Sequence, residues 1–413
     1  MIQSFTIDGK RMEERLKKLS EMGQTKDGGV HRMALSEDDF QAQELVAEWM
    51  RQAGMTVRRD HFCNLIGRRE GKGSGKPVIM MGSHIDSVPN GGRFDGTIGV
   101  IGAIEAVQAI HDAGLQTEYP IEVVAFCDEE GPRFSGGLFG SQGMVGRIQP
   151  GDLQKKDAQG ITRYEALKRF DLNPDRMADS IRIPGEIKVY LEMHIEQGPY
   201  LESINEPVGI VTGIAGPAWI GVKVKGEAGH AGTVPMHLRK DPMVGAAEII
   251  LAIHRICGKD PSAPTVGTVG KIQSFPGGSN VIPEGVEFTV DIRDIDLSRR
   301  DRVMAEIRSA IDEICGRYQL QVEIEENMNV LPVECSDHVV KAMQEASESL
   351  GLQAPKMVSG AGHDAMLLAD IADMGMIFVR CRNGISHSPK EWAETEDIVK
   401  GTKLLLGTVL NYV

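Results

Sequence analysis

Strand-like apolar runs alternate with helical patterns in the first half of the chain. Residues 77–86 (PVIMMGSHID) predict a buried strand, and residues 97–114 predict a helix with an apolar face. Residues 120–131 and 189–198 predict two further strands. Strands that alternate with helices favour a mostly parallel sheet covered by helices on both faces. The alternation therefore predicts an α/β fold.

The pattern changes in the middle of the chain. Residues 214–329 show strands and helices in the order β-α-β-β-α-β, which is typical of a compact α+β sandwich. A helix predicted at 336–351 and a strand at 375–384 then resemble the first half again. We therefore predict one α/β domain in two parts, residues 1–213 and residues 330–413, with a smaller α+β domain inserted between them.

Charge and composition exclude several functions. The formal net charge is −14, which argues against general binding to nucleic acid or to an anionic membrane, because both favour clustered Lys and Arg. The six cysteines include no CxxC pair, so neither a disulfide framework nor a zinc ribbon is predicted. No stretch approaches 18 uninterrupted apolar residues, and the charged N-terminal sequence lacks the apolar core of a signal peptide. We expect a cytoplasmic protein without a membrane span.

Each of four predicted strands ends in a His or a carboxylate. The first strand and its glycine-rich loop carry His84, Asp86 and Asp95, and the second strand ends at Asp128, Glu129 and Glu130. The third strand ends near His194, and the fourth is followed by His387. In open α/β sheets the carboxyl edge is where ligands bind. A single His at a strand end is usually structural, but four such coincidences argue for a shared site.

The residue types at these strand ends favour a metal. Imidazole and carboxylate without thiolate suit Zn, Mn, Co or Ni. Three His and two or three carboxylates exceed the needs of one tetrahedral ion, whereas two ions that share a carboxylate would use them all. A remaining carboxylate beside the ligands could take a proton from water.

Six motifs then become recognisable as a set. GSHIDSVPNGGRFDG, FCDEEGPRF, MHIEQG, GHAGTVPM, SGAGHDAM and GISHSPKE occur in this order between about residue 25 and residue 400. Together they resemble the motifs of the M20-type metallohydrolases, in the amidase/hydantoinase/carbamoylase branch. That branch includes N-carbamoyl-L-amino-acid hydrolases, allantoate amidohydrolases and β-ureidopropionases.

The resemblance implies a role for each residue of the predicted metal site. His84 and His194 would bind one ion, Glu130 and His387 the other, and Asp95 would bridge them. Glu129 matches the catalytic base, and Asp86 matches the acid that orients the His84 ring. A His at position 194, where most peptidases of this class have an acid, points to the carbamoylase branch.

The inserted domain resembles the lid and dimerisation domain of the family. Its His230 matches a histidine that stabilises the oxyanion, reaching the site of the partner subunit in a homodimer. Asn280 and Arg293 match residues that hold the substrate, and alternation along the strand turns Arg293 away from the apolar face and toward the cleft. Gln197 and Gly360, within the quoted motifs, are further expected substrate contacts.

The implied activity is hydrolysis of the ureido C–N bond of N-carbamoyl-L-amino acids. Residues 216–219 (Gly-Pro-Ala-Trp) are apolar, unlike the polar segment typical of allantoate enzymes, so allantoate amidohydrolase is the second choice. β-Ureidopropionase and an aminoacylase-like peptidase are less favoured alternatives. A catalytically silent dimeric binding protein is disfavoured because Glu129 and Asp95 are both present.

Overall fold

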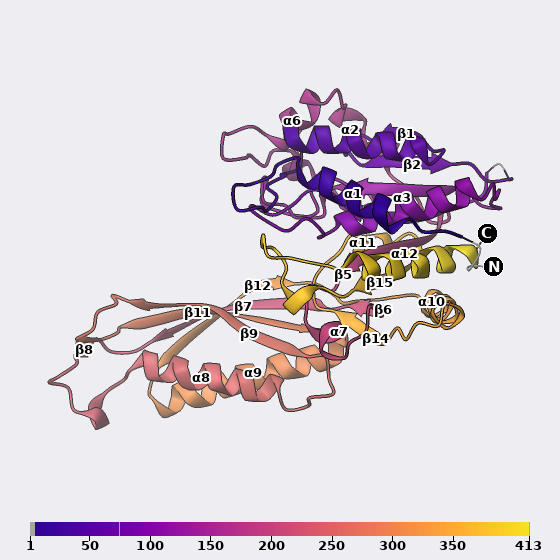
Figure 1. Ribbon diagram of the computed structural model, residues 1–413. Coiled ribbons are helices and arrows are strands. Elements are labelled where there is room, and N and C mark those ends of the chain that lie inside the picture. Colours follow the sequence, from indigo (N-terminus) through magenta and orange to yellow (C-terminus); the bar gives the residue numbers. More distant parts are fainter. Residues whose placement is uncertain (1–4, 74, 413) are drawn as a thin grey trace. The chain divides into compact units, whose positions relative to one another are not determined.

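The computed structural model describes residues 5–73 and 75–412 as two compact units (Figure 1). One unit combines Met1–Thr212 with Cys335–Val413, and the other is Gly213–Glu334. The second border lies beyond residue 329 because Val333 and Glu334 still pair with Ile214 and Gly213. Among the described residues, no helix is long and apolar enough to cross a bilayer.

The larger unit is built on a mixed sheet with a parallel centre. Its main strand order is β1-β2-β4-β3-β5-β15-β6-β13, with β14 paired to β6. The parallel strands are β4 (Ile121–Phe126), β3 (Val78–His84), β5 (Ile187–Ile195) and β15 (Asp373–Val379). The antiparallel margins are β1 (Thr56–Arg59), β2 (Leu65–Arg69) and β6 (Val208–Ile214), and the side strand β14 is Lys356–Ser359. The last strand of the order, β13 (Val333–Glu334), belongs to the smaller unit and pairs with the last two residues of β6. The predicted α/β class with a mostly parallel sheet is confirmed.

Helices pack on this sheet in separate groups. The helices α3 (Thr97–Asp112), α12 (Thr395–Leu410) and α1 (Gly9–Ser20) contact one another, and α10 (Asp337–Ser349) contacts α12. Both α3 and α12 also contact the central strands. The short helices α4 (Phe139–Met144) and α11 (Ala365–Leu368) contact each other and strands β4, β5 and β15, while α2 (Glu37–Gln52) covers β1 and β2. The strand β3 is buried along its whole length, which explains its continuous apolar sequence.

Parallel pairing brings four strand ends to one edge. Strands β3, β4, β5 and β15 are neighbours that run in the same direction. Their carboxyl ends therefore lie side by side, and the loops that follow them meet there. This edge is where the sequence placed its His and carboxylate residues.

The smaller unit is a four-stranded antiparallel sheet with two helices. The strand order is β12-β7-β11-β9, formed by β7 (Gly216–Lys225), β9 (Val266–Phe275), β11 (Gly285–Asp294) and β12 (Gln321–Asn329). The helices α8 (Pro242–Cys257) and α9 (Leu297–Arg317) bury their apolar stripes on it, around residues such as Ile249, Phe288 and Ile311. The β-α-β-β-α-β order is as predicted.

One element of the smaller unit has no clear signal in the sequence. The short strands β8 (Gly229–His230) and β10 (Val281–Ile282) form a separate antiparallel pair. Each has only two residues, too few to show the alternation that marks a strand.

Candidate metal centre

The strand ends and their loops hold the predicted ligands in place. His84 ends β3, His194 lies one residue before the end of β5, and Asp95 comes just before α3. Gly96, at φ +62°, caps α3, and a Cβ there would lie 2.3 Å from Nε2 of His84. Only glycine allows the Asp95 loop to approach the His84 ring so closely.

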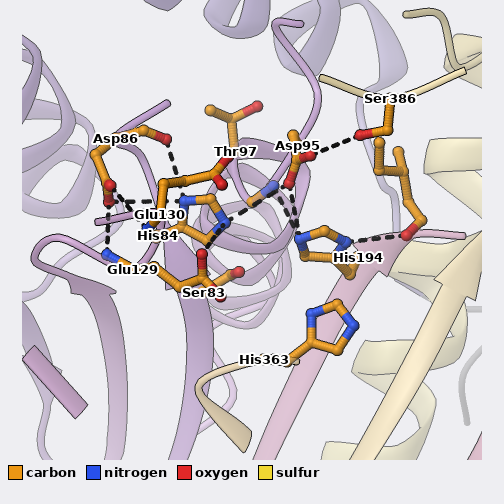
Figure 2. A network of polar contacts seen from close by, with 12 residues as sticks. Ser83, His84, Asp86, Asp95, Thr97, Glu129, Glu130, His194, His363 and Ser386 are labelled. Atoms are coloured by element: carbon orange, nitrogen blue, oxygen red, sulfur yellow. Dashed lines mark hydrogen bonds and ion pairs between the residues drawn. The ribbon is translucent and has the colours of Figure 1, made fainter. Parts of the chain in front are cut away.

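The structure brings the five predicted ligands into two groups that share Asp95. One group is His84, Asp95 and His194, and the other is Asp95, Glu130 and His387; within each, the ligand atoms lie within 4.8 Å of one another. Figure 2 shows dashed lines from the His84 and His194 rings to Asp95, with Glu130 on the side of Asp86.

The two oxygens of Asp95 face different groups. Oδ1 lies 3.1 Å from Nε2 of His194 and 3.7 Å from Nε2 of His84. Oδ2 lies 3.3 Å from Nε2 of His387. A carboxylate placed in this way can serve one ion with each oxygen, which is the geometry of a bridging ligand.

The charges in the centre suit divalent cations. Burial raises the pKa of Glu130 to about 7, and the charge of Asp95 adds to this shift. Burial acts to lower the pKa of His194, but the hydrogen bond and charge of Asp95 outweigh it and raise that pKa to about 9. Oε1 of Glu130 is buried without a hydrogen-bond partner. A cation would displace protons from these groups and satisfy the unpaired oxygen, so the residues fit divalent metal ions.

Asp86 contacts both the His84 ring and the loop after β4. Its carbonyl oxygen lies 3.1 Å from Nδ1 of His84, whereas the carboxylate Oδ1 lies 3.7 Å away. The carboxylate instead accepts the backbone N–H groups of Glu129 and Glu130, both at 3.2 Å. Asp86 thus orients the ring mainly through its backbone, and its side chain fixes the Glu129–Glu130 turn.

Glu129 lies beside the ligand groups without joining either of them. Its Oε2 is 3.7 Å from Nε2 of His84. Burial raises the pKa of Glu129 well above its usual range, and the negative charges of Asp364 and Glu130 add to the shift. A carboxylate whose proton affinity is raised in this way can act as a general base near neutral pH.

Gln197 and Gly360 lie in different surroundings. Nε2 of Gln197 donates to Oδ2 of Asp95 at 2.8 Å, so this side chain contacts the shared carboxylate. Gln197 and His387 both have left-handed backbone conformations, at φ +55° and +54°, which are uncommon for non-glycine residues and cluster at functional sites. Gly360 is exposed in the turn between β14 and α11.

The structure brings together two of the three predicted residues of the smaller unit. His230 pairs with Val281, and the carbonyl of Asn280 accepts the N–H of Ala231 at 3.0 Å. Arg293 lies near the other end of β11, where it pairs with Pro217. Sequence alternation predicted a side chain turned toward the cleft. In the structure the guanidinium forms an ion pair with Asp291, whose Oδ2 lies 2.8 Å from Nη2.

Three further polar residues at the centre have no role in the sequence-based interpretation. His363 packs its ring 4.6 Å from that of His194 and hydrogen-bonds to Ser359 at 2.8 Å through Nε2. Ser386 donates to Oδ2 of Asp95 at 2.7 Å, and Glu391 is buried nearby. All three residues lie within the six motifs, so their positions in the motifs could have marked them as part of the site. The spacing of residues in a motif does not tell a metal ligand from a residue that supports one.

Comparison with known proteins agrees with this geometry. Residues 80–411 match the family model "Peptidase family M20/M25/M40", and the chain belongs to this family. It is 57% identical to an N-carbamoyl-L-amino-acid amidohydrolase of Pseudomonas sp. (strain NS671), with all of both chains covered. It is 36% identical to an allantoate deiminase of Arabidopsis thaliana, over 94% of this chain and 79% of the relative.

A solved structure places the chain within the family. A hydantoinase/carbamoylase family amidase from Burkholderia multivorans superimposes with a TM-score of 0.93 at 36% identity, covering 99% of this chain and 98% of the other. The chain thus stands in the hydantoinase/carbamoylase branch.

Proposed function

We propose that the chain hydrolyses the ureido C–N bond of N-carbamoyl-L-amino acids to the amino acid, ammonia and carbon dioxide. The observation that carries the proposal is the full-length similarity to the Pseudomonas amidohydrolase. The ligand groups that share Asp95, with Glu129 beside them, supply what an amide hydrolase of this kind needs.

The chain's own residues would divide the work as follows. His84 and His194 would hold one divalent ion, Glu130 and His387 a second, and Asp95 would bind both. When bound, two ions of Zn, Mn, Co or Ni would polarise the ureido carbonyl and lower the pKa of water. Glu129 would accept a proton from the attacking water and pass it to the leaving amine.

Residues of the smaller unit would bind the substrate. Arg293 would hold its carboxylate, since a guanidinium can contact both oxygens of a carboxylate at once. His230 would donate a hydrogen bond to the oxyanion, with Asn280 beside it. Arg293 and His230 lie toward opposite ends of β11, which spans Gly285 to Asp294. The eight steps from Gly285 to Arg293 separate Arg293 from the end of β11 next to His230 by roughly 26 Å, at about 3.3 Å per residue.

This separation supports a homodimer. In an N-carbamoyl amino acid only a nitrogen and the α-carbon lie between the ureido carbonyl and the carboxylate carbon. One copy of the smaller unit cannot place both Arg293 and His230 against a molecule of that size. We propose that His230 and Asn280 serve the site of the partner subunit.

The smaller unit also offers an apolar surface for association. On α8, Val244 and Leu251 are seven residues apart on one face of the helix and are 43% and 57% exposed. On the edge strand β9, Val266 and Ile272 are about half exposed. An unpaired strand edge beside an exposed apolar helix stripe is a suitable surface for a second copy.

Allantoate hydrolysis is the second candidate, because the Arabidopsis allantoate deiminase also matches most of the chain. The segment Gly216–Trp219 favours the first candidate. It begins β7 and carries an exposed Trp219, without a polar side chain for a second ureido group.

One assay separates these candidates. Ammonia release is measured in parallel from N-carbamoyl-L-methionine and from allantoate, before and after removal of metal with a chelator. The proposal predicts faster release from the carbamoyl amino acid and loss of both activities on chelation. Preference for allantoate would select the second candidate, and full activity after complete metal removal would contradict the metal-dependent mechanism.

A further inference from the structure

Glu391 is a buried acid four residues beyond His387. Its side chain is 3% exposed, and it lies in the loop that leads into α12. Oε1 accepts two consecutive backbone N–H groups, from Phe94 at 2.8 Å and from Asp95 at 3.1 Å. One carboxylate oxygen of Glu391 thus holds the backbone of the residue that is shared by both ligand groups.

The second oxygen of Glu391 reaches the same residue by another route. Oε2 lies 3.1 Å from Oγ of Ser386, and that hydroxyl lies 2.7 Å from Oδ2 of Asp95. Ser386 immediately precedes His387. Glu391 therefore connects the loop that carries Asp95 with the loop that carries His387, and fixes Asp95 at its backbone and at its side chain.

The sequence of the Asp95 loop makes room for this acid. A Cβ on Gly92 would lie 2.0 Å from Cδ of Glu391, so a side chain at position 92 would displace the carboxylate. Among the described residues, no Lys or Arg forms an ion pair with Glu391. A buried carboxylate without a cationic partner is costly unless hydrogen bonds satisfy it. The N–H groups of Phe94 and Asp95 satisfy one oxygen of Glu391, and the hydroxyl of Ser386 lies against the other.

The two ligand groups depend unequally on these loops. His84 and His194 lie at the ends of the central strands β3 and β5, where sheet pairing fixes their backbones. His387 lies on a loop with its side chain 50% exposed. Loss of the connection between the loops should therefore disturb the group of Asp95, Glu130 and His387 more than the group of His84, Asp95 and His194.

We propose that Glu391 is a positioning residue that sets the distance between Asp95 and His387 and so completes the second cation site. This inference rests on the two-ion centre of the proposed function. Glu391 acts through Asp95 and Ser386 and not on the substrate. What matters is the geometry of its hydrogen bonds, which a glutamine can reproduce: the amide oxygen would accept both N–H groups, and the amide nitrogen would donate to Ser386.

The test is a calorimetric titration of metal-stripped protein with Co²⁺, combined with the visible absorption spectrum of bound Co²⁺, for the unaltered chain and for Glu391→Ala and Glu391→Gln. The matched control is Asp60→Ala. Asp60 is likewise a buried acid, whose Oδ1 accepts the N–H groups of Phe62 and Asn64, but it lies in the turn between β1 and β2. Thermal unfolding is recorded for every variant.

In Glu391→Ala, the second binding step should weaken by about 10- to 100-fold, as is usual when a group that supports a ligand is removed, while the first step changes much less. Glu391→Gln should restore the second step and its spectrum, and Asp60→Ala should lower stability without changing either step. Equal weakening in Glu391→Ala and Asp60→Ala, equal loss in both Glu391 variants, or two unchanged steps would overturn the positioning role. If the unaltered chain binds no Co²⁺, the proposed function fails as well.

Discussion

The candidate metal centre of the larger unit and the proposed substrate-binding residues of the smaller unit are built in different ways. Four of the five ligands are buried or nearly so, and each is fixed by a strand end or by a hydrogen bond within the same unit. His230 and Asn280 are exposed, on a two-residue strand pair and its adjoining turn. The ligand groups of the larger unit are enclosed by their own chain, whereas His230 and Asn280 of the smaller unit are open to solvent.

Under the proposed function, this difference separates metal binding within one chain from substrate binding that would depend on a dimer. The ligand atoms already converge within one chain, so metal binding should be a property of the single subunit. His230 and Arg293 lie toward opposite ends of β11, so the proposed homodimer would bring them to one substrate from two chains. We therefore expect changes in the larger unit to abolish metal binding or chemistry outright, and changes in the smaller unit to act through dimerisation and substrate affinity.

The largest effect is expected for Asp95→Ala. Because each oxygen of Asp95 faces a different ligand group, its removal should abolish tight binding of both ions and all measurable turnover. Elemental analysis of the purified variant checks this outcome. Asp60→Ala serves as the control for loss of a buried acid. Retention of two ions per subunit would contradict the bridging role of Asp95, because the centre would then not depend on a shared ligand.

Glu129→Gln should leave the metal content unchanged but slow turnover. General-base contributions are about 100- to 10,000-fold, so kcat should fall by that factor while two ions stay bound. Steady-state kinetics and metal analysis on the same sample measure both quantities. A variant that keeps most of its kcat would place the base elsewhere, and one that loses metal would make Glu129 a ligand.

Much of the larger unit could be predicted from its sequence because local signals and the fold agree there. Both β3 and β5 are almost wholly buried because both faces of the sheet are covered there, and β3 is apolar up to Gly82. Their ends carry His84 and His194, which a buried strand does not need. Parallel pairing then places these residues at one edge, which made His84, Asp86 and His194 predictable as neighbours.

Contacts between loops were not predictable in the same way. The contact of Glu391 with Asp95 joins residues 296 positions apart, and neither loop has a periodic pattern that could set its path. The same limit applies in the smaller unit. The alternation of β11 predicted the face on which Arg293 lies, but not its ion pair with Asp291 on the same face.

Mixing two inactive variants tests the proposal that His230 serves the site of the partner subunit. His230→Ala should lower kcat by about 100- to 1,000-fold, as expected for loss of an oxyanion donor. In a dimer that combines Glu129→Gln with His230→Ala, one site has an intact Glu129 in its own chain and an intact His230 from the partner. Random exchange should recover roughly a quarter of the unaltered activity, because half of the dimers are mixed and each has one complete site.

Two controls make the mixing result decisive. Exchange of subunits is verified with differently tagged chains, and Leu251→Glu, which places a charge on the exposed stripe of α8, should give monomers in sedimentation and prevent recovery. Verified exchange without recovered activity would show that His230 acts within its own chain, and the smaller unit would then resemble the larger one in being complete by itself.

The smallest effect is expected for Arg293, and it should appear mainly in KM. A hydrogen bond between charged groups contributes about 1.5 to 3 kcal/mol, so Arg293→Ala should raise KM for N-carbamoyl amino acids by roughly 10- to 100-fold. Arg293→Lys should recover little, because a single ammonium group cannot reproduce two parallel contacts with a carboxylate. Metal content should be unchanged in both variants.

The charge of the substrate distinguishes recognition from support of the fold. Because Asp291 engages Nε and Nη2 of Arg293, the substitution also leaves that acid without its ion pair, and part of any loss could come from the strand itself. An N-carbamoyl amino acid amide has no negative charge for Arg293 to bind, so it should be a poor substrate of the unaltered chain and lose little more in Arg293→Ala. Equal losses for the acid and the amide would mean that Arg293 supports β11 through Asp291. The carboxylate would then be bound by another residue, and the smaller unit would contribute His230 and Asn280 alone.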